Sequence, residues 1–159
     1  MTAFATSFAT WCQHTAIAEA IRSAPWPFPV IEIFHIAGMV VVFGTVLILN
    51  LRVFGLILRG EPVSQIAQDL TPLTLTGLGV QFASGSLMFI VSAMKFTENA
   101  LFGIKIGLVI LAAAYHFAIH RKAAIAKDTQ PRRLRLSAAV SLVLWAGVVL
   151  VGLDIGVLS

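Results

Sequence analysis

Four long apolar stretches limit what this chain can fold into. Each has roughly the 20 or more residues that a helix needs to cross the hydrocarbon core of a bilayer. They cover residues 30–58, 73–94, 100–120 and 136–158. Within lipid, only helices and closed barrels satisfy all their backbone hydrogen bonds, and continuous apolar runs indicate helices rather than alternating barrel strands. The sequence therefore predicts an all-α integral membrane protein, a bundle of four transmembrane helices.

The composition excludes several other classes of protein. Of the 159 residues, 58% are hydrophobic and 11% are charged, whereas soluble domains average about 45–50% apolar and about 25% charged residues. This excludes an ordinary cytosolic enzyme, a disordered chain and a nucleic-acid-binding domain, despite a pI of about 9.9. The single cysteine, Cys12, excludes an internal disulfide framework and a multi-cysteine metal site. We expect one membrane domain over residues 1–159 and no nucleic-acid partner.

Residues 3–23 differ from the four apolar stretches because Ala, Phe and Ile alternate there with Thr, Gln, His, Glu and Arg. This pattern predicts an amphipathic helix that lies on the membrane surface. The proline-rich run at residues 25–29 then predicts a stiff turn into the first span, with Trp26 and Phe28 in the interfacial aromatic belt. Residues 69–72 predict the start of the second span, after a loop at residues 60–71 that has room for a short surface helix.

Basic residues predict the orientation in the membrane. Eight of the 11 Lys and Arg residues lie in or beside the first and third loops: Arg52, Arg59, Arg121, Lys122, Lys127, Arg132, Arg133 and Arg135. The positive-inside rule places these loops in the cytoplasm, and the run at residues 132–135 is typical of an anchor near anionic lipid. We therefore expect a multi-pass protein of the bacterial inner membrane, with both termini in the periplasm.

A few ionisable residues lie inside the predicted spans, where they are costly and usually functional. They are Glu32, His35, Lys105, His116 and Asp154. We expect four of them to lie in the outer half of the membrane: Glu32, His35, Lys105 and Asp154. His116 follows Lys105 by eleven residues, about 16 Å along a helix and on the same face. We therefore expect that His35 and His116 do not bind one iron atom from opposite sides.

His35 is the main candidate for a cofactor ligand. Gly38 follows it by one helical turn, and the second span offers a patch of small residues, Ser84-Gly85-Ser86. Such small residues leave space for a flat macrocycle beside the histidine. The alternative interpretation is that small residues let membrane helices pack closely, and that the histidine only bonds to a neighbouring carbonyl.

The other polar candidates each have two interpretations. Lys105 forms an ion pair with Asp154 or Glu32, or it binds an anionic group such as a haem propionate. His14 folds over the outer end of the bundle as a second axial ligand, or it is a solvated surface histidine. His116 is an inner ligand, a proton relay or a packed polar residue, and together with His120 it could hold a small ion.

Copper is the alternative cofactor, because imidazole and thioether groups suit that metal. Met88 and Met94 belong to the outer part of the second span, near the predicted positions of His14 and His35. The candidate metal ligands are therefore His35, His14 and His116, whichever metal is bound.

Several segments resemble a bacterial family of four-helix membrane proteins of unknown function, the DUF6644 type. The first span of that family resembles PVIEIFHIAG at residues 29–38 with Gly44 and LRVFG at 51–55; the second resembles LTPLT at 70–74 and GSLMF at 85–89; the third resembles NALFGIK at 99–105. The resemblance covers nearly the whole chain after residue 26. It implies a four-helix membrane fold and no particular activity.

A more distant resemblance links a histidine in the first span to a third span with Lys105 and the pair Tyr115-His116. This combination is similar to HemJ-type protoporphyrinogen oxidases and CopD-like copper-resistance membrane domains. The HemJ resemblance implies a haem-linked site with His35 and Lys105. The Asn-Glu-x-Pro element of HemJ-type chains is absent, because residues 136–139 read LSAA.

Together these observations favour a protein that binds haem b in the outer half of the bundle and has an electron-transfer or redox role. The predicted cofactor-binding residues are His35, Lys105, His14, His116, Gly38 and Gly85. Expected partners are membrane lipid, a quinone or periplasmic redox protein, and further copies of the chain. The alternatives are a CopD-like copper protein, a HemJ-like porphyrinogen oxidase, and a non-catalytic subunit of a membrane complex. The residues leave open whether the protein is itself an enzyme, and no catalytic residue is predicted.

Overall fold

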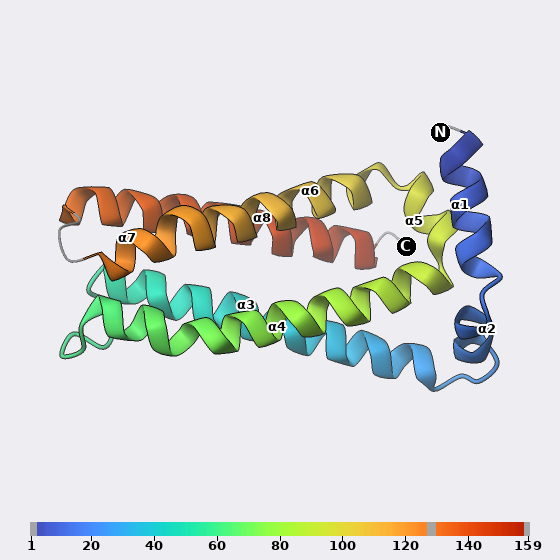
Figure 1. Cartoon of the computed structure of the whole chain (residues 1–159), viewed down its shortest axis with the longest axis horizontal. Helices are drawn as coiled ribbons and strands as arrows, with labels where there is room; N and C mark the ends of the chain where they lie inside the picture. Colours follow the sequence, from blue (N-terminus) through green and yellow to red (C-terminus); the bar gives the residue numbers. More distant parts are fainter. Residues whose placement is uncertain (1–2, 127–129, 158–159) are drawn as a thin grey trace.

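A computed structural model describes residues 3–126 and 130–157, and all regular elements in this part of the chain are helical. Figure 1 shows two pairs of long helices that run side by side. The pairs consist of α3 (Pro27–Val53) with α4 (Val63–Val91), and α6 (Ala100–Tyr115) with α8 (Pro131–Val157). Contacts of α3 with α8, and of α4 with α7 (Arg121–Ile125), join the two pairs. The predicted all-α four-helix architecture is confirmed.

Four segments of the described chain are long and apolar enough to cross a membrane: Pro27–Val53, Val63–Val91, Ala100–Ile125 and Pro131–Leu153. Their outward faces carry large apolar side chains, such as Phe82 with 80% and Val143 with 72% of its surface exposed. Apolar surface on this scale is typical of contact with lipid rather than water. The chain is therefore a multi-pass membrane protein.

The second span differs most from its prediction. Helix α4 begins at Val63, ten residues before the predicted start at residue 73, and Pro72 lies inside the helix. Its first turns are held by packing, because Ala67 is buried against Leu49 of α3 and Ala124 of α7. Packing of this kind outweighs the loss of one backbone hydrogen bond at a proline. The surface helix expected in the loop is thus the beginning of the span itself.

The other helix ends also shift for identifiable reasons. Helix α3 stops at Val53 rather than at residue 58, because Gly55 takes a φ of +74°, which favours glycine. Helix α8 starts at Pro131 rather than at residue 136, consistent with the preference for proline in a first helical turn. The third span changes after Tyr115 to a π-helical turn, η1 (His116–His120), and then continues past residue 120 as α7.

The segment predicted as one surface helix forms two helices, α1 (Ala3–Gln13) and α2 (Ala16–Arg22). The chain breaks at Thr15, whose hydroxyl accepts a hydrogen bond from the backbone N–H of Ala18 at 3.3 Å and so caps α2. In Figure 1 these helices lie across one end of the long bundle, beside α5 (Ala93–Glu98). We call this the N-terminal end. The opposite end, which carries Arg59 and Arg121, is called the basic end.

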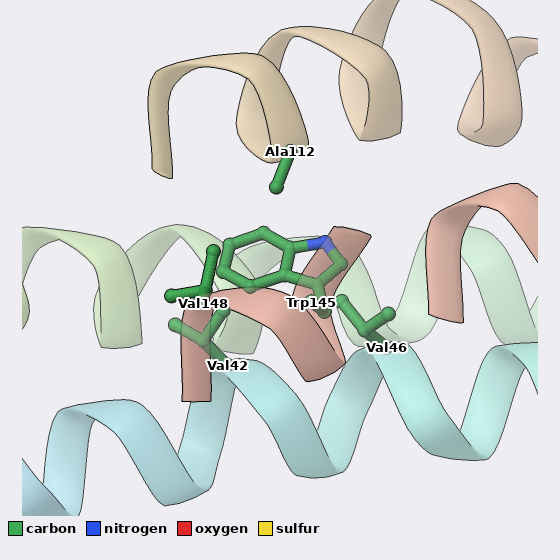
Figure 2. Close-up of a cluster of buried hydrophobic side chains, with 5 residues drawn as sticks. All are labelled: Val42, Val46, Ala112, Trp145 and Val148. Atoms are coloured by element: carbon green, nitrogen blue, oxygen red, sulfur yellow. The ribbon is translucent and has the colours of Figure 1, made fainter. Parts of the chain in front are cut away.

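The central core lies where the two helix pairs meet. Val42 and Val46 of α3, Ala112 of α6, and Trp145 and Val148 of α8 form one buried cluster (Figure 2). The alanine lets the indole of Trp145 fit between the helices. This cluster separates two polar regions, one toward each end of the bundle.

Candidate functional site

His35 lies inside α3 in the half of the bundle near the N-terminal end, and its side chain faces α4. Its Nδ1 atom is 3.0 Å from the hydroxyl oxygen of Ser84. That hydroxyl also lies 2.6 Å from the backbone carbonyl of Val80, and when it donates there it accepts from the imidazole. This arrangement favours the tautomer of His35 with its proton on Nδ1 and a free lone pair on Nε2.

Helix α4 holds this histidine at two further points. The side-chain amide of Gln81 donates to the backbone carbonyl of His35 at 3.0 Å. A Cβ atom placed on Gly85 would lie 3.1 Å from Cε1 of the imidazole, so the missing side chain of Gly85 makes room for the ring itself. Ser84, Gln81 and Gly85 thus fix the position of the ring from one helix face.

Lys105 of α6 approaches the same region from the other helix pair. Its side chain passes over Gly152 of α8, where an added Cβ would lie 3.6 Å from both Cε and Nζ. The ammonium group lies within electrostatic range of the His35 imidazole. The structure therefore brings together the two residues that were predicted to share a site, although they are separated by 70 positions in the sequence.

Carboxylate partners for Lys105 were predicted at Glu32 and Asp154. Glu32 is exposed on α3, and within the described side chains no hydrogen bond or ion pair engages Lys105. Asp154 belongs to α8, but its side chain lies outside the described residues, so the Asp154 alternative stays a prediction.

Gly38 serves close packing of helices in this structure. An added Cβ would lie 3.0 Å from the backbone oxygen of Gly77 on α4 and 3.1 Å from Cγ of Gln81. The space predicted for a macrocycle at this glycine is therefore filled by the backbone of α4. A groove of about 270 Å³ lies elsewhere between the same two helices and is lined by Ile31, Phe34, Val80, Ala83, Ser84 and Leu87.

The remaining histidines lie away from His35. His14 is exposed in the turn between α1 and α2, whereas His35 lies eight residues, or about 12 Å, into α3. His116 and His120 belong to the π-helical turn at the other half of the third span. Neither His14 nor the pair His116 and His120 therefore lies at the level of His35 in the bundle.

The described part of the chain contains no cluster of ligands for the copper alternative. Met94 packs with Ala9 and Cys12 of α1 near the N-terminal end, and its sulfur lies 3.9 Å from the hydroxyl of Thr10. In the described part of the chain, no group of three or more His, Cys, Asp or Glu side chains converges on one point.

A second polar region lies between the central core and the basic end. The Nδ1 atom of His120 lies 3.0 Å from the hydroxyl oxygen of Ser137 on α8. Ala112 and Trp145 meet in the central core. Because α6 and α8 run antiparallel, His116 and Ser141 lie at a level between the Ala112–Trp145 pair and the His120–Ser137 pair. Each of the two is four residues from the members of these pairs on its own helix. Asn50, four residues after Val46 on α3, reaches the same level.

This region, which we call the polar layer, consists of Asn50, His116, His120 and Ser141 with the indole nitrogen of Trp145 at its border. The four side chains are at most 3% exposed. One buried polar atom of each residue has no hydrogen-bond partner: Asn50 Oδ1, His116 Nδ1, His120 Nε2, Ser141 Oγ and Trp145 Nε1. Such an atom costs about 1–3 kcal/mol when it stays unpaired.

Sequence reasoning singled out the histidines but missed the polar residues around them. Gln81 was not considered, and Ser84 was noted only for its small size. The members of the polar layer on α8 follow a simple signal, because Ser137, Ser141 and Trp145 are spaced by four residues and so share one helix face. The π-helical turn has no such signal in the sequence.

Comparison with known proteins gives one match. Neither the curated proteins nor the solved structures contain a match to this chain. The sequence pattern described as "Family of unknown function (DUF6644)" matches residues 30–158, which cover the last three spans and all but the first three residues of the first span. The chain therefore belongs to the family of unknown function DUF6644.

Proposed function

We propose that this protein binds haem b in the half of the bundle near the N-terminal end and transfers electrons in the membrane. One observation carries the proposal: Nδ1 of His35 lies 3.0 Å from the Ser84 hydroxyl, which also bonds to the carbonyl of Val80, an arrangement that favours a lone pair on Nε2 for a metal. Metal-binding histidines are typically oriented by a hydrogen bond from their other ring nitrogen. When bound, the haem supplies one-electron redox chemistry, and the protein supplies ligation and electrostatics.

The donor set fits a haem better than a bare metal ion. The imidazole of His35 offers one nitrogen to the iron, and the ammonium of Lys105 offers a positive charge near the carboxylates at the edge of the macrocycle. A metal ion without a macrocycle would need further ligands, and among the described residues no three His, Cys, Asp or Glu side chains converge on one point. A second ligand to the iron would come from water, a small molecule or a group from another chain.

A lipid-soluble quinone is the redox partner that this site suits best. The groove between α3 and α4 has an apolar surface, and both helices belong to spans. Ser84 lines that groove and also contacts His35. A quinone could therefore approach from the bilayer without passing through water. We also place the basic end in the cytoplasm, following the positive-inside rule, which puts the haem in the periplasmic half of an inner membrane.

The experiment is an absorption spectrum of the protein purified in detergent after expression with ample haem precursor. We expect a Soret band and, after reduction with dithionite, the α and β bands of a b-type haem. Elemental analysis of the same sample distinguishes iron from copper. A sample with stoichiometric copper and no Soret band would favour metal handling, and a sample with neither that co-purifies with another membrane polypeptide would favour a non-catalytic subunit.

A further inference from the structure

The polar layer near the basic end plays no part in the proposed haem site, yet it concentrates buried polar groups. His120 and Asn50 are fully buried, and Ser141 and His116 are nearly so. Elsewhere in the core, buried polar groups do find partners: the hydroxyl of Thr74 lies 2.9 Å from that of Thr45. The polar layer is therefore a local exception, and we expect a bound ion or molecule to pair with its free polar atoms.

The hydrogen bonds at its edges decide what that occupant must offer. The Ser137 hydroxyl lies 2.8 Å from the carbonyl of Leu134 and 3.0 Å from Nδ1 of His120. When it donates to the carbonyl it accepts from Nδ1–H, and the unpaired Nε2 of His120 then keeps its lone pair. The amide nitrogen of Asn50 donates to the carbonyl of Val46 at 2.7 Å, which leaves Oδ1 as an unpaired acceptor. These two atoms both require a donor.

Other atoms of the polar layer require an acceptor. The indole N–H of Trp145 is a donor without a partner, and in Figure 2 its nitrogen lies on the side of the ring toward Val46. The unpaired hydroxyl of Ser141 both donates and accepts. The occupant must therefore donate to some groups and accept from others.

A cation does not meet this requirement. It would bind the lone pairs of His120 Nε2 and Asn50 Oδ1, but the N–H of Trp145, a donor, would repel it. The polar layer contains no carboxylate to balance an added charge, and the guanidinium of Arg121 already lies within electrostatic range of His116. Arg121 is fixed there by donating to the hydroxyl of Thr71 at 2.7 Å. A neutral molecule with both donors and acceptors is favoured instead.

We propose that the polar layer binds internal water, which connects His116 and His120 to Asn50, Ser141 and Trp145. Buried water typically bonds to about three such otherwise unpaired groups. The π-helical turn begins at one of these histidines and ends at the other, and π-helical turns occur frequently at functional sites. Through this water both imidazoles exchange protons although their rings are buried. The site is independent of whether haem binds at His35.

The test uses the full chain with 15N-labelled histidine, reconstituted in lipid nanodiscs. NMR measures the transfer of magnetisation from water to each imidazole, and the signals are assigned with His116→Gln and His120→Gln. We expect transfer to both buried rings in the wild-type protein. In the double variant Asn50→Leu with Ser141→Ala, which makes the layer apolar, this transfer falls several-fold while the His35 signal is unchanged.

Thr45→Val is the matched control, because it alters a buried polar group that already has a partner; it should leave the transfer to both rings unchanged. The wild-type measurement decides the question even where the double variant does not accumulate. Absence of transfer to both rings overturns the proposal. A bound metal ion would also overturn the proposal. The result that shows it is one equivalent of metal per chain, together with a shift of the His116 and His120 signals when a chelator removes that metal.

Discussion

The hydroxyl of Ser84 influences which nitrogen of His35 is free to bind a ligand. When it donates to the carbonyl of Val80 it accepts from Nδ1 of the imidazole. A residue named in the sequence only for its small size thus sets the chemistry of the candidate ligand. The pairing was not predictable from sequence, because it depends on how α3 and α4 are aligned along their axes.

Replacing Ser84 tests this role at the level of a single bond. We expect Ser84→Ala to weaken haem binding about 10–100-fold, the usual effect of losing a partner that orients a metal ligand. Titration of haem into the cofactor-free variant measures the change. Ser86→Ala, the same substitution two positions along α4, is the control and should bind haem as the wild-type protein does. Equal affinities for both variants would show that Ser84 does not orient His35.

Lys105 places a positive charge near His35, and that charge has a measurable consequence. We expect Lys105→Gln to lower the midpoint potential of the bound haem, because removing a nearby cation stabilises the oxidised form relative to the reduced form. Spectroelectrochemical titration measures this potential. Lys122→Gln, which removes an exposed charge at the basic end, should leave it unchanged. A rise, or an equal change in both variants, would contradict a position of Lys105 beside the haem.

At the scale of the elements, the contact between α3 and α4 positions the candidate site. The two helices approach closely at Gly38 and Gly77, where an added Cβ on Gly77 would lie 2.8 Å from Cγ2 of Val42. Close approach at small residues is the usual way that membrane helices associate. This contact keeps Ser84 and Gln81 at the level of His35.

We therefore expect Gly77→Ala to lower the free energy of unfolding by about 1–3 kcal/mol, the range for overpacking a filled interior. Thermal unfolding in detergent, followed by circular dichroism, measures the loss. Gly79→Ala is a matched control, because nothing lies within 4 Å of the added methyl group; it should be neutral or slightly stabilising, since alanine favours helix more than glycine does. Equal stability of the two variants would argue against the close contact.

The number of spans and the helical class were predictable from hydropathy, but several boundaries were not. Pro72 suggested a helix start, whereas the buried contacts of Ala67 extend α4 back to Val63. The π-helical turn at residues 116–120 depends on how His116 and His120 pack against α8, a tertiary property. The proximity of His35 and Lys105 was predicted from their similar depth, while the hydrogen-bond partners of His35 follow from helix rotations that the hydropathy pattern does not specify.

At the scale of the whole molecule, the two ends of the bundle differ in kind. Helices α1 and α2 cross one end, where Trp11 of α1 and Trp26, the residue before α3, are exposed; both side chains favour the membrane interface. Arg22 ties them to the bundle by donating to the carbonyl of Val91 at 3.2 Å. The basic end carries most of the cationic residues. This asymmetry supports one orientation, with the basic end in the cytoplasm.

Cysteine labelling of spheroplasts tests the orientation. In a Cys12→Ser background, a membrane-impermeant maleimide should label Ala24→Cys in intact spheroplasts and Gly60→Cys only after the membrane is opened. Both positions are exposed in the structure, one near the N-terminal end and one near the basic end. The reverse pattern would place the basic end in the periplasm.

The most direct test of the central claim is the haem-to-protein ratio of purified wild-type protein and of His35→Ala, measured by the pyridine haemochrome method after reconstitution with haem. His14→Ala is the matched control, since it removes an exposed histidine outside the bundle core. We predict about one haem b per wild-type chain and per His14→Ala chain, and a ratio near zero for His35→Ala. A wild-type protein that takes up no haem, or a His35→Ala variant that binds as much as the wild type, would contradict the account.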